Sequence, residues 1–134
     1  MGNWIPGDVT FVSQLLKLSS SYMLPPPDGF VSPMAWGVDA HIIERFGQAG
    51  VPEEKISMAK DTYHFVSANQ SPTHLSELFR QFYGPTMNAF EAAQKSGKVE
   101  ELQNQLLELA KAQNQSTDGG TSIPATFSRV TVCL

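Results

Sequence analysis

Apolar residues recur every three or four positions along four stretches of the chain, the spacing that defines one face of an α-helix. This pattern predicts helices over residues 10–22, 36–47, 71–97 and 98–115. The prolines at 25–27 end the first helix, because they supply no backbone donors. Gly84 and Pro85 interrupt the third stretch, so we expect that helix to break or kink there.

Two other stretches favour β-strands. Residues 55–67 and 125–133 are rich in aromatic and β-branched side chains, although Lys60 and Asp61 interrupt the alternation in the first. The helices between them rule out a tight hairpin, but the two strands can still be neighbours in one sheet. A two-stranded sheet is marginal unless helices cover it or other strands extend it. The short segment around Trp4 could supply a third strand, and it is typical of the tail of something longer.

The length and charge narrow the function classes. A chain of 134 residues can bury one hydrophobic core, so residues 1–134 are expected to form a single domain. Nine basic and 13 acidic side chains give a net charge of −4, and the basic residues are scattered. This pattern disfavours nucleic acids and anionic membranes as partners. No leader peptide or membrane span is recognisable, and the single cysteine suits a reducing compartment, so we expect a cytoplasmic protein.

Motifs for metal, nucleotide or nucleophilic chemistry are absent from the sequence. The three histidines have no metal-ligand spacing, and no glycine-rich phosphate loop or serine elbow occurs. Cys133 lies between Val132 and Leu134, which favours packing over reactivity. We therefore expect no metal and no cofactor.

The candidate site residues are large apolar and amphipathic side chains close to chain breaks, where regular packing buries them less easily. The residues expected to bind a hydrophobic substrate are Trp4, Met23, Trp36 and Met87. Hydrogen-bond donors near them are the candidate catalytic groups: Tyr22, Tyr63, His64, Arg80 and Tyr83. Because Tyr63 and His64 are adjacent on a predicted strand, we expect one of the two to face inward.

Three passages together resemble small-molecule S-adenosylmethionine-dependent methyltransferases of the ubiquinone-biosynthesis-like type. Residues 2–7 (GNWIPG) and 25–37 (PPPDGFVSPMAWG) are similar to that family's "ANWTP … PPPPG … SPLLWG". Residues 83–92 (YGPTMNAFEA) are similar to "YYGPTxxAFEAL", and residues 114–121 (NQSTDGGT), followed by Pro124, are similar to "HNRATDGTTVVP".

This resemblance covers essentially the whole chain but only the second, substrate-side half of the family's fold. It implies an α/β protein, or α+β for this chain alone, with four to five helices and an antiparallel strand pair at a sheet edge. The glycine-rich cofactor loop belongs to the other half, so no cofactor-binding residue carries over and autonomous methyl transfer is not expected. An exposed sheet edge invites a second copy or a partner subunit.

Two classes of function follow from these observations. The first is a cofactor-independent enzyme of specialised metabolism that binds a hydrophobic small molecule and catalyses an isomerisation or a pericyclic, Diels–Alder-type cyclisation. Such a reaction needs only a near-attack geometry and one or two polarising hydrogen bonds. The second is a truncated or heteromeric methyltransferase subunit, or a small-molecule binder without catalysis.

Overall fold

The computed structural model describes all residues, 1–134, and shows a mixed α/β protein. It has five α-helices and a three-stranded antiparallel sheet; all helical residues, those of two short 3₁₀ helices included, make up 51% of the chain and the strands 20%. The strands are β1 (Gly2–Trp4), β2 (Ile56–Ser67) and β3 (Thr121–Val132). The helices are α1 (Phe11–Tyr22), α2 (Asp39–Gln48), α3 (Pro72–Phe82), α4 (Gly84–Ser96) and α5 (Val99–Gln113), with short 3₁₀ helices η1 (Pro33–Gly37) and η2 (Glu53–Lys55). No helix is both long and apolar enough to cross a membrane.

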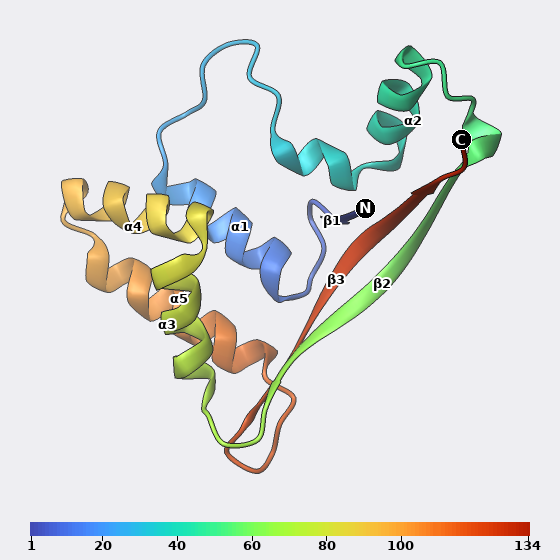
Figure 1. The fold of residues 1–134 in the computed structure, drawn as a ribbon. Coiled ribbons are helices and arrows are strands. Elements are labelled where there is room, and N and C mark those ends of the chain that lie inside the picture. The colour runs from blue at the N-terminus through green and yellow to red at the C-terminus, as the bar shows by residue number, and fades with distance from the viewer.

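The sheet has the order β1-β3-β2, and its two long strands dominate it (Figure 1). β2 and β3 pair over their full length, from Ile56 opposite Val132 to Ser67 opposite Thr121. β1 adds three residues on the other side of β3, with Trp4 opposite Phe127. The predicted antiparallel pair and third strand are therefore confirmed.

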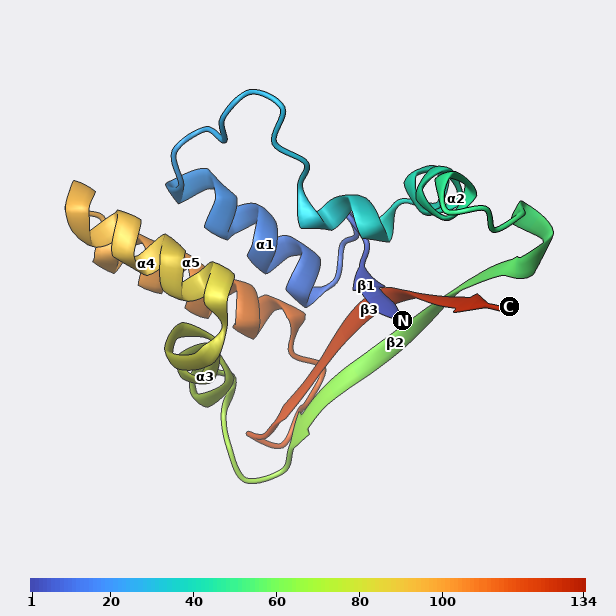
Figure 2. The same ribbon diagram turned by 45° about the horizontal axis from the view of Figure 1, so that its top comes forward.

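The main core lies where α1 and α5 cover one end of β3, with α4 packed against both helices (Figure 2). Odd-numbered residues of β3 face these helices, and Ile123 and Ala125 are fully buried there. Phe11 and Leu15 of α1 and Leu106 of α5 complete the centre of the core. Thr10, which precedes α1, accepts a hydrogen bond of 2.8 Å from the backbone N–H of Thr126. This bond fixes the start of the helix against the strand.

Two short elements, η1 and α2, pack on the opposite face of the sheet near its other end and are here called the second cover. Even-numbered residues of β3 face it, and Val130 is almost fully buried there, while Ile42 is the buried residue of α2. Gly37 at the end of η1 lies so close to β1 that an added Cβ would sit 2.0 Å from the Trp4 carbonyl oxygen. Only glycine permits this approach, so Gly37 ties the second cover to β1.

Several sequence predictions need correction. Residues 36–47 do not form one helix, because η1 occupies residues 33–37 and α2 begins at Asp39. β3 begins at residue 121 rather than 125, since the Asn114 side chain accepts the Ser122 N–H at 2.8 Å and orders the turn before it. Cys133 is exposed rather than packed, because it follows the last residue of β3. The break at Gly84-Pro85 is confirmed, since α3 ends at Phe82 and α4 begins at Gly84.

Candidate functional site: an aromatic cluster between sheet and helices

Seven aromatic side chains from β1, β2, β3, α1 and the α3–α4 junction meet on the face of the sheet that carries the main core. They are Trp4, Phe11, Tyr63, Phe65, Phe79, Tyr83 and Phe127, here called the aromatic cluster. The rings meet edge to face: Tyr63 and Phe65 have centroids 4.9 Å apart, and Phe65 and Phe79 are 5.6 Å apart. The edge-to-face arrangement is favourable because a positive ring edge meets a negative ring face.

The register of the strands brings together those members of the aromatic cluster that lie on the sheet. Side chains of paired residues in an antiparallel sheet point to the same face, and successive residues alternate. Trp4 is opposite Phe127, and the Tyr63 position is opposite Ala125 in the next pair along the same face. The end of α3 then brings Phe79 and, one turn later, Tyr83 over that face, with their rings 5.1 Å apart.

The cluster is only partly covered. Phe11 is fully buried, but Tyr63 is 55% exposed and the remaining five rings are partly exposed. A hollow of about 410 Å³ lies at its sheet end, lined by Gly2, Asn3, Trp4, Tyr63, Phe65 and Phe127. This volume falls at the low end of small-molecule sites, which range from about 300 to 1,000 Å³. The site therefore fits a small apolar ligand that stacks against ring faces and edges.

Two members of the aromatic cluster carry a phenol: Tyr63 lines the hollow, and Tyr83 lies outside its lining. Burial raises the pKa of the Tyr83 phenol, and a hydrogen bond from the Trp4 indole lowers it by less. The phenol is therefore a neutral donor at physiological pH. Asn3 has a buried side-chain nitrogen without a hydrogen-bond partner, but it is opposite Ser128 rather than Phe127, so this nitrogen lies on the other face of the sheet.

Three of the predicted site residues, Trp4, Tyr63 and Tyr83, are brought together by the fold. Met87 lies one turn beyond Tyr83 on α4, where its N–H bonds to the Tyr83 carbonyl at 2.9 Å, and its side chain is 46% exposed. His64 points to the opposite face of the sheet. Both Tyr63 and His64 are exposed, so the prediction that one faces inward is wrong. The middle of β2 lies beyond the helices that cover its end.

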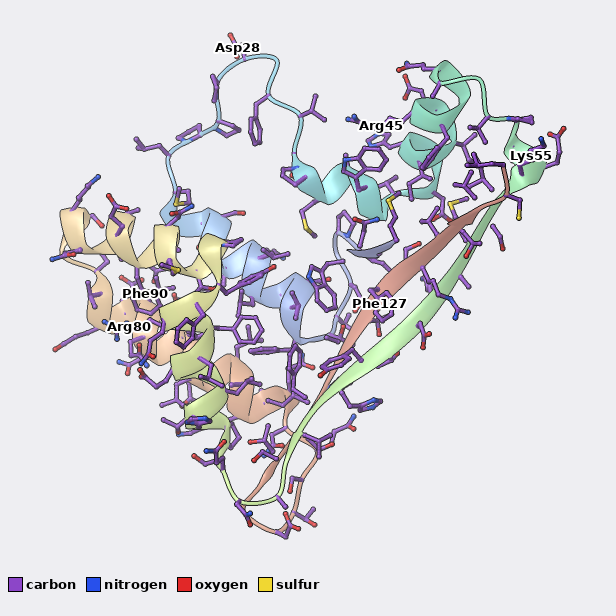
Figure 3. All side chains as sticks on the ribbon, in the orientation of Figure 1. Asp28, Arg45, Lys55, Arg80, Phe90 and Phe127 are labelled. Atoms are coloured by element: carbon purple, nitrogen blue, oxygen red, sulfur yellow. The ribbon has the colours of Figure 1, made fainter.

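The other predicted residues lie elsewhere and have partners of their own. Arg80 stacks over the Phe90 ring at 4.4 Å and donates to Gln103 at 2.8 Å, on the helical side and away from Phe127 (Figure 3). Trp36 packs against Phe46 and under Arg45 in the second cover. Tyr22 donates to Gln105 at 2.5 Å, and the adjacent Met23 is 43% exposed. These residues do not form one site.

Sequence reasoning missed four members of the cluster: Phe11, Phe65, Phe79 and Phe127. Phe65 and Phe127 lie in the two stretches that favour strands, and Phe79 lies on the apolar face of the helix predicted from residue 71, so none of the three was chosen as a site residue. That face is narrower than the pattern predicted, since Leu78 is 39% and Phe82 is 75% exposed. The available signal was the alternation of Tyr63 with Phe65, which puts both rings on one face of a strand.

A second hollow of about 410 Å³ lies on the opposite face of the sheet, between the long strands and the second cover. Asp39, Lys60 and Ser128 line it together with apolar residues, and it contains none of the predicted site residues. No three His, Cys, Asp or Glu side chains gather closely enough to hold a metal ion. Comparisons with protein-family models, curated proteins and solved structures gave no match for this chain.

Proposed function

We propose that this chain binds an apolar, unsaturated small molecule on the aromatic cluster and accelerates its isomerisation or pericyclic cyclisation without a cofactor. The observation that supports this most is the cluster itself: Trp4, Tyr63, Phe65 and Phe127 present exposed or partly exposed rings around one hollow. Large aromatic surfaces left accessible on a small protein commonly mark a ligand or partner site.

The chemistry requires only positioning and polarisation. In a Diels–Alder-type cyclisation two carbon–carbon σ bonds form while two π bonds are consumed and one shifts, so no proton, electron or co-reactant enters or leaves. Ring faces that hold both reacting ends in contact can lower the barrier by several kcal/mol, up to about 7–11 kcal/mol in ideal cases. The neutral Tyr83 phenol would donate to a carbonyl on the dienophile, where electron density increases in the transition state.

Binding can be tested with the fluorescent apolar probe 1-anilinonaphthalene-8-sulfonate. We expect Phe127→Ala to weaken probe binding by about 3- to 10-fold, the equivalent of one aromatic pair. Phe82→Ala is the matched control, because Phe82 is 75% exposed and outside the cluster. Equal effects of the two substitutions on probe affinity, with melting temperatures unchanged, would contradict the site.

Turnover can be tested with a panel of conjugated dienes and trienes that carry a carbonyl group. An isomerase or cyclase converts its substrate to a product of the same mass and a different chromatographic retention time. Tyr83→Phe should lower kcat while the probe still binds, because it removes the polarising donor and keeps the ring. Probe binding without any product of equal mass would reduce the proposal to a small-molecule binder.

A second candidate, a methyltransferase subunit, is favoured by one structural observation. β2 is paired on one side only, so its other edge is open to strands supplied by another chain. The residues of this chain do not fit S-adenosylmethionine by themselves, since the turn after β1 contains Gly7 alone rather than a glycine-rich loop. Calorimetric titration with S-adenosylmethionine distinguishes the candidates: heat of binding only after addition of a partner chain would favour the subunit.

Both candidates suit a protein of the cytoplasm that acts in specialised metabolism. The substrate class is the same in each case, a hydrophobic small molecule, because the aromatic cluster would face it in both. A methyltransferase pair would need a nucleophilic oxygen, nitrogen or carbon on that molecule, whereas the pericyclic reaction needs a diene and a dienophile. The panel of conjugated carbonyl compounds therefore tests the first candidate alone.

A further inference from the structure

The outer edge of β2 is unpaired along its whole length. β2 has 12 residues and is the last strand in the order β1-β3-β2, and no segment of the chain lies beyond it (Figures 1 and 2). Such an edge presents a row of free N–H and C=O groups, which is a template for another strand. A question follows about which strand would pair there.

The residues that present these groups can be identified from the pairing with β3. The N–H of Val130 bonds to Met1 and that of Thr126 to Thr10, both away from β2, while the N–H of Cys133 bonds to Lys55 at 2.9 Å. Hydrogen bonding alternates along an antiparallel pair, so odd-numbered residues of β2 bond to β3. The even-numbered residues direct their backbone groups outward: Ile56, Met58, Lys60, Thr62, His64 and Val66. The N–H of Thr62 donates to the Asp61 carboxylate at 2.9 Å, a bond that it would exchange for one to a strand paired at this edge.

The exposed area of the molecule is larger than its mass predicts. The chain exposes 8288 Å², whereas a compact monomer of 14.7 kDa exposes about 6,900 Å². The difference exceeds the roughly 800 Å² that each partner buries in an interface of standard size. Part of the excess flanks the free edge, where Tyr63, Val66 and Leu78 are 55%, 71% and 39% exposed and surround one shallow hollow.

The side-chain charges and the length of strand that can be paired favour one register between the β2 edges of two copies. A two-fold axis perpendicular to the sheet places equivalent faces of the two copies on the same side of the joined sheet. Even-numbered residues of one copy must therefore be opposite even-numbered residues of the other. Two registers pair nearly the whole strand. One of them sets Asp61 opposite Asp61 of the second copy, and like charges directly opposite are destabilising. The other centres on Thr62, sets Lys60 opposite His64, and pairs Met58 with Val66.

The geometry points to a homodimer in which β2 pairs antiparallel with β2 of a second copy, with Thr62 opposite Thr62 on the two-fold axis. The two sheets become one six-stranded sheet joined by roughly ten new backbone hydrogen bonds. Val66, which is 71% exposed in one copy, gains an apolar neighbour in Met58 of the second copy. This pairing goes beyond the proposed ligand site and does not depend on it.

The second copy would also contribute to the aromatic cluster. In this register Asp61 of the second copy lies opposite Tyr63, in a non-hydrogen-bonded pair whose Cα atoms are about 4.5 Å apart. Both side chains are on the face that carries the cluster. The carboxylate can accept the Tyr63 hydroxyl hydrogen and so fix the ring, which is 55% exposed in a single copy. The dimer would thus close the open side of the hollow.

Sedimentation equilibrium without any ligand tests the dimer directly. We expect a mass twice 14.7 kDa once the protein concentration is raised to about 100 µM. The concentration has to reach this range because small interfaces can be weak. Thr62→Lys would set two ammonium groups opposite each other and should raise the dimer dissociation constant by about tenfold or more. Thr62→Val, which keeps the shape, should leave it unchanged. A monomer at every concentration, or equal behaviour of the two variants, overturns the proposal.

Disulfide trapping tests the register, in a Cys133→Ser background so that only the new cysteine reacts. Thr62→Cys should form an interchain disulfide under mild oxidation, because the paired Cα atoms are about 5.5 Å apart and within disulfide range. His64→Cys is the matched control, since the two copies of residue 64 are offset by about 13 Å along the strands. Trapping of His64→Cys at the same rate as Thr62→Cys overturns the Thr62-centred register.

Discussion

The two covers of the sheet bury very different amounts of apolar surface. Helices α1, α4 and α5, together with β3, form one continuous cluster of 11 buried residues. The second cover, η1 and α2, brings a single fully buried apolar side chain, Ile42. Both α1 and α2 are amphipathic in sequence. What distinguishes them is the surface that each helix meets, so periodicity predicts the helix but not how strongly it is held.

This difference bears on the aromatic cluster, which lies on the main-core face but includes Trp4 of β1, the strand that η1 contacts. Phe11 and Phe79 belong to the well-packed side, with ring centroids 5.4 Å apart. Trp4 lies on β1, which contacts η1 through Gly37. Local opening of the second cover would therefore release the Trp4 side of the cluster while the Phe79 side stays folded. Ligand binding that uses both sides would stabilise the weaker cover.

The largest expected effect comes from the main core. Leu106 is 1% exposed at the centre of the main core. Leu106→Ala should therefore lower the free energy of unfolding by about 3 to 5 kcal/mol through lost burial and a new cavity. Urea denaturation followed by circular dichroism measures this change. Leu24→Ala is the control, because Leu24 is 89% exposed and should change stability by no more than about 0.5 kcal/mol. A Leu106→Ala loss as small as the control would mean that this core is not formed as described.

A smaller effect is expected in the second cover. Ile42 is as buried as Leu106, but few buried neighbours surround it, so Ile42→Ala should lower the free energy of local opening of the second cover by about 2 kcal/mol. Amide hydrogen exchange should accelerate mainly within residues 39–48, and the exchange of α5 should be nearly unchanged. Uniformly faster exchange in both regions would show that the two covers unfold as one unit.

The sequence was sufficient for most elements and insufficient for the site. Apolar spacing predicted the helical stretch of α3 and α4, and Gly84-Pro85 predicted a break or kink within it, because those signals are local. The cluster depends on register, which places Trp4 opposite Phe127 and is invisible in the spacing of either segment. Proximity to a chain break did not identify the residues of the site, since it selected Trp36 in the second cover as well as Trp4 in the aromatic cluster. Long-range pairing decides which aromatic residues meet.

The last prediction concerns Tyr83, at the junction between α3 and α4, where its ring packs against Phe79. The raised pKa of Tyr83 means that the unfolded chain releases the phenolic proton first as the pH rises. The folded state therefore loses stability once the pH passes the ordinary tyrosine value near 10, and regains it as the pH falls again. Tyr83→Phe removes this term and should flatten the alkaline fall in stability. At neutral pH it should lower stability by less than about 1 kcal/mol, through loss of a hydrogen bond.

The measurement is urea denaturation between pH 8 and about pH 11, a range that brackets the ordinary tyrosine pKa. It is made in a Tyr22→Phe background, because burial and the nearby Glu101 also raise the pKa of Tyr22. In that background the remaining fall of the unfolding free energy with rising pH reports on Tyr83 more directly. An unchanged slope after Tyr83→Phe would show that the phenol is hydrated in the folded protein. The cluster would then be open to water at the α3–α4 junction, and Tyr83 could not act as a desolvated donor toward a bound ligand.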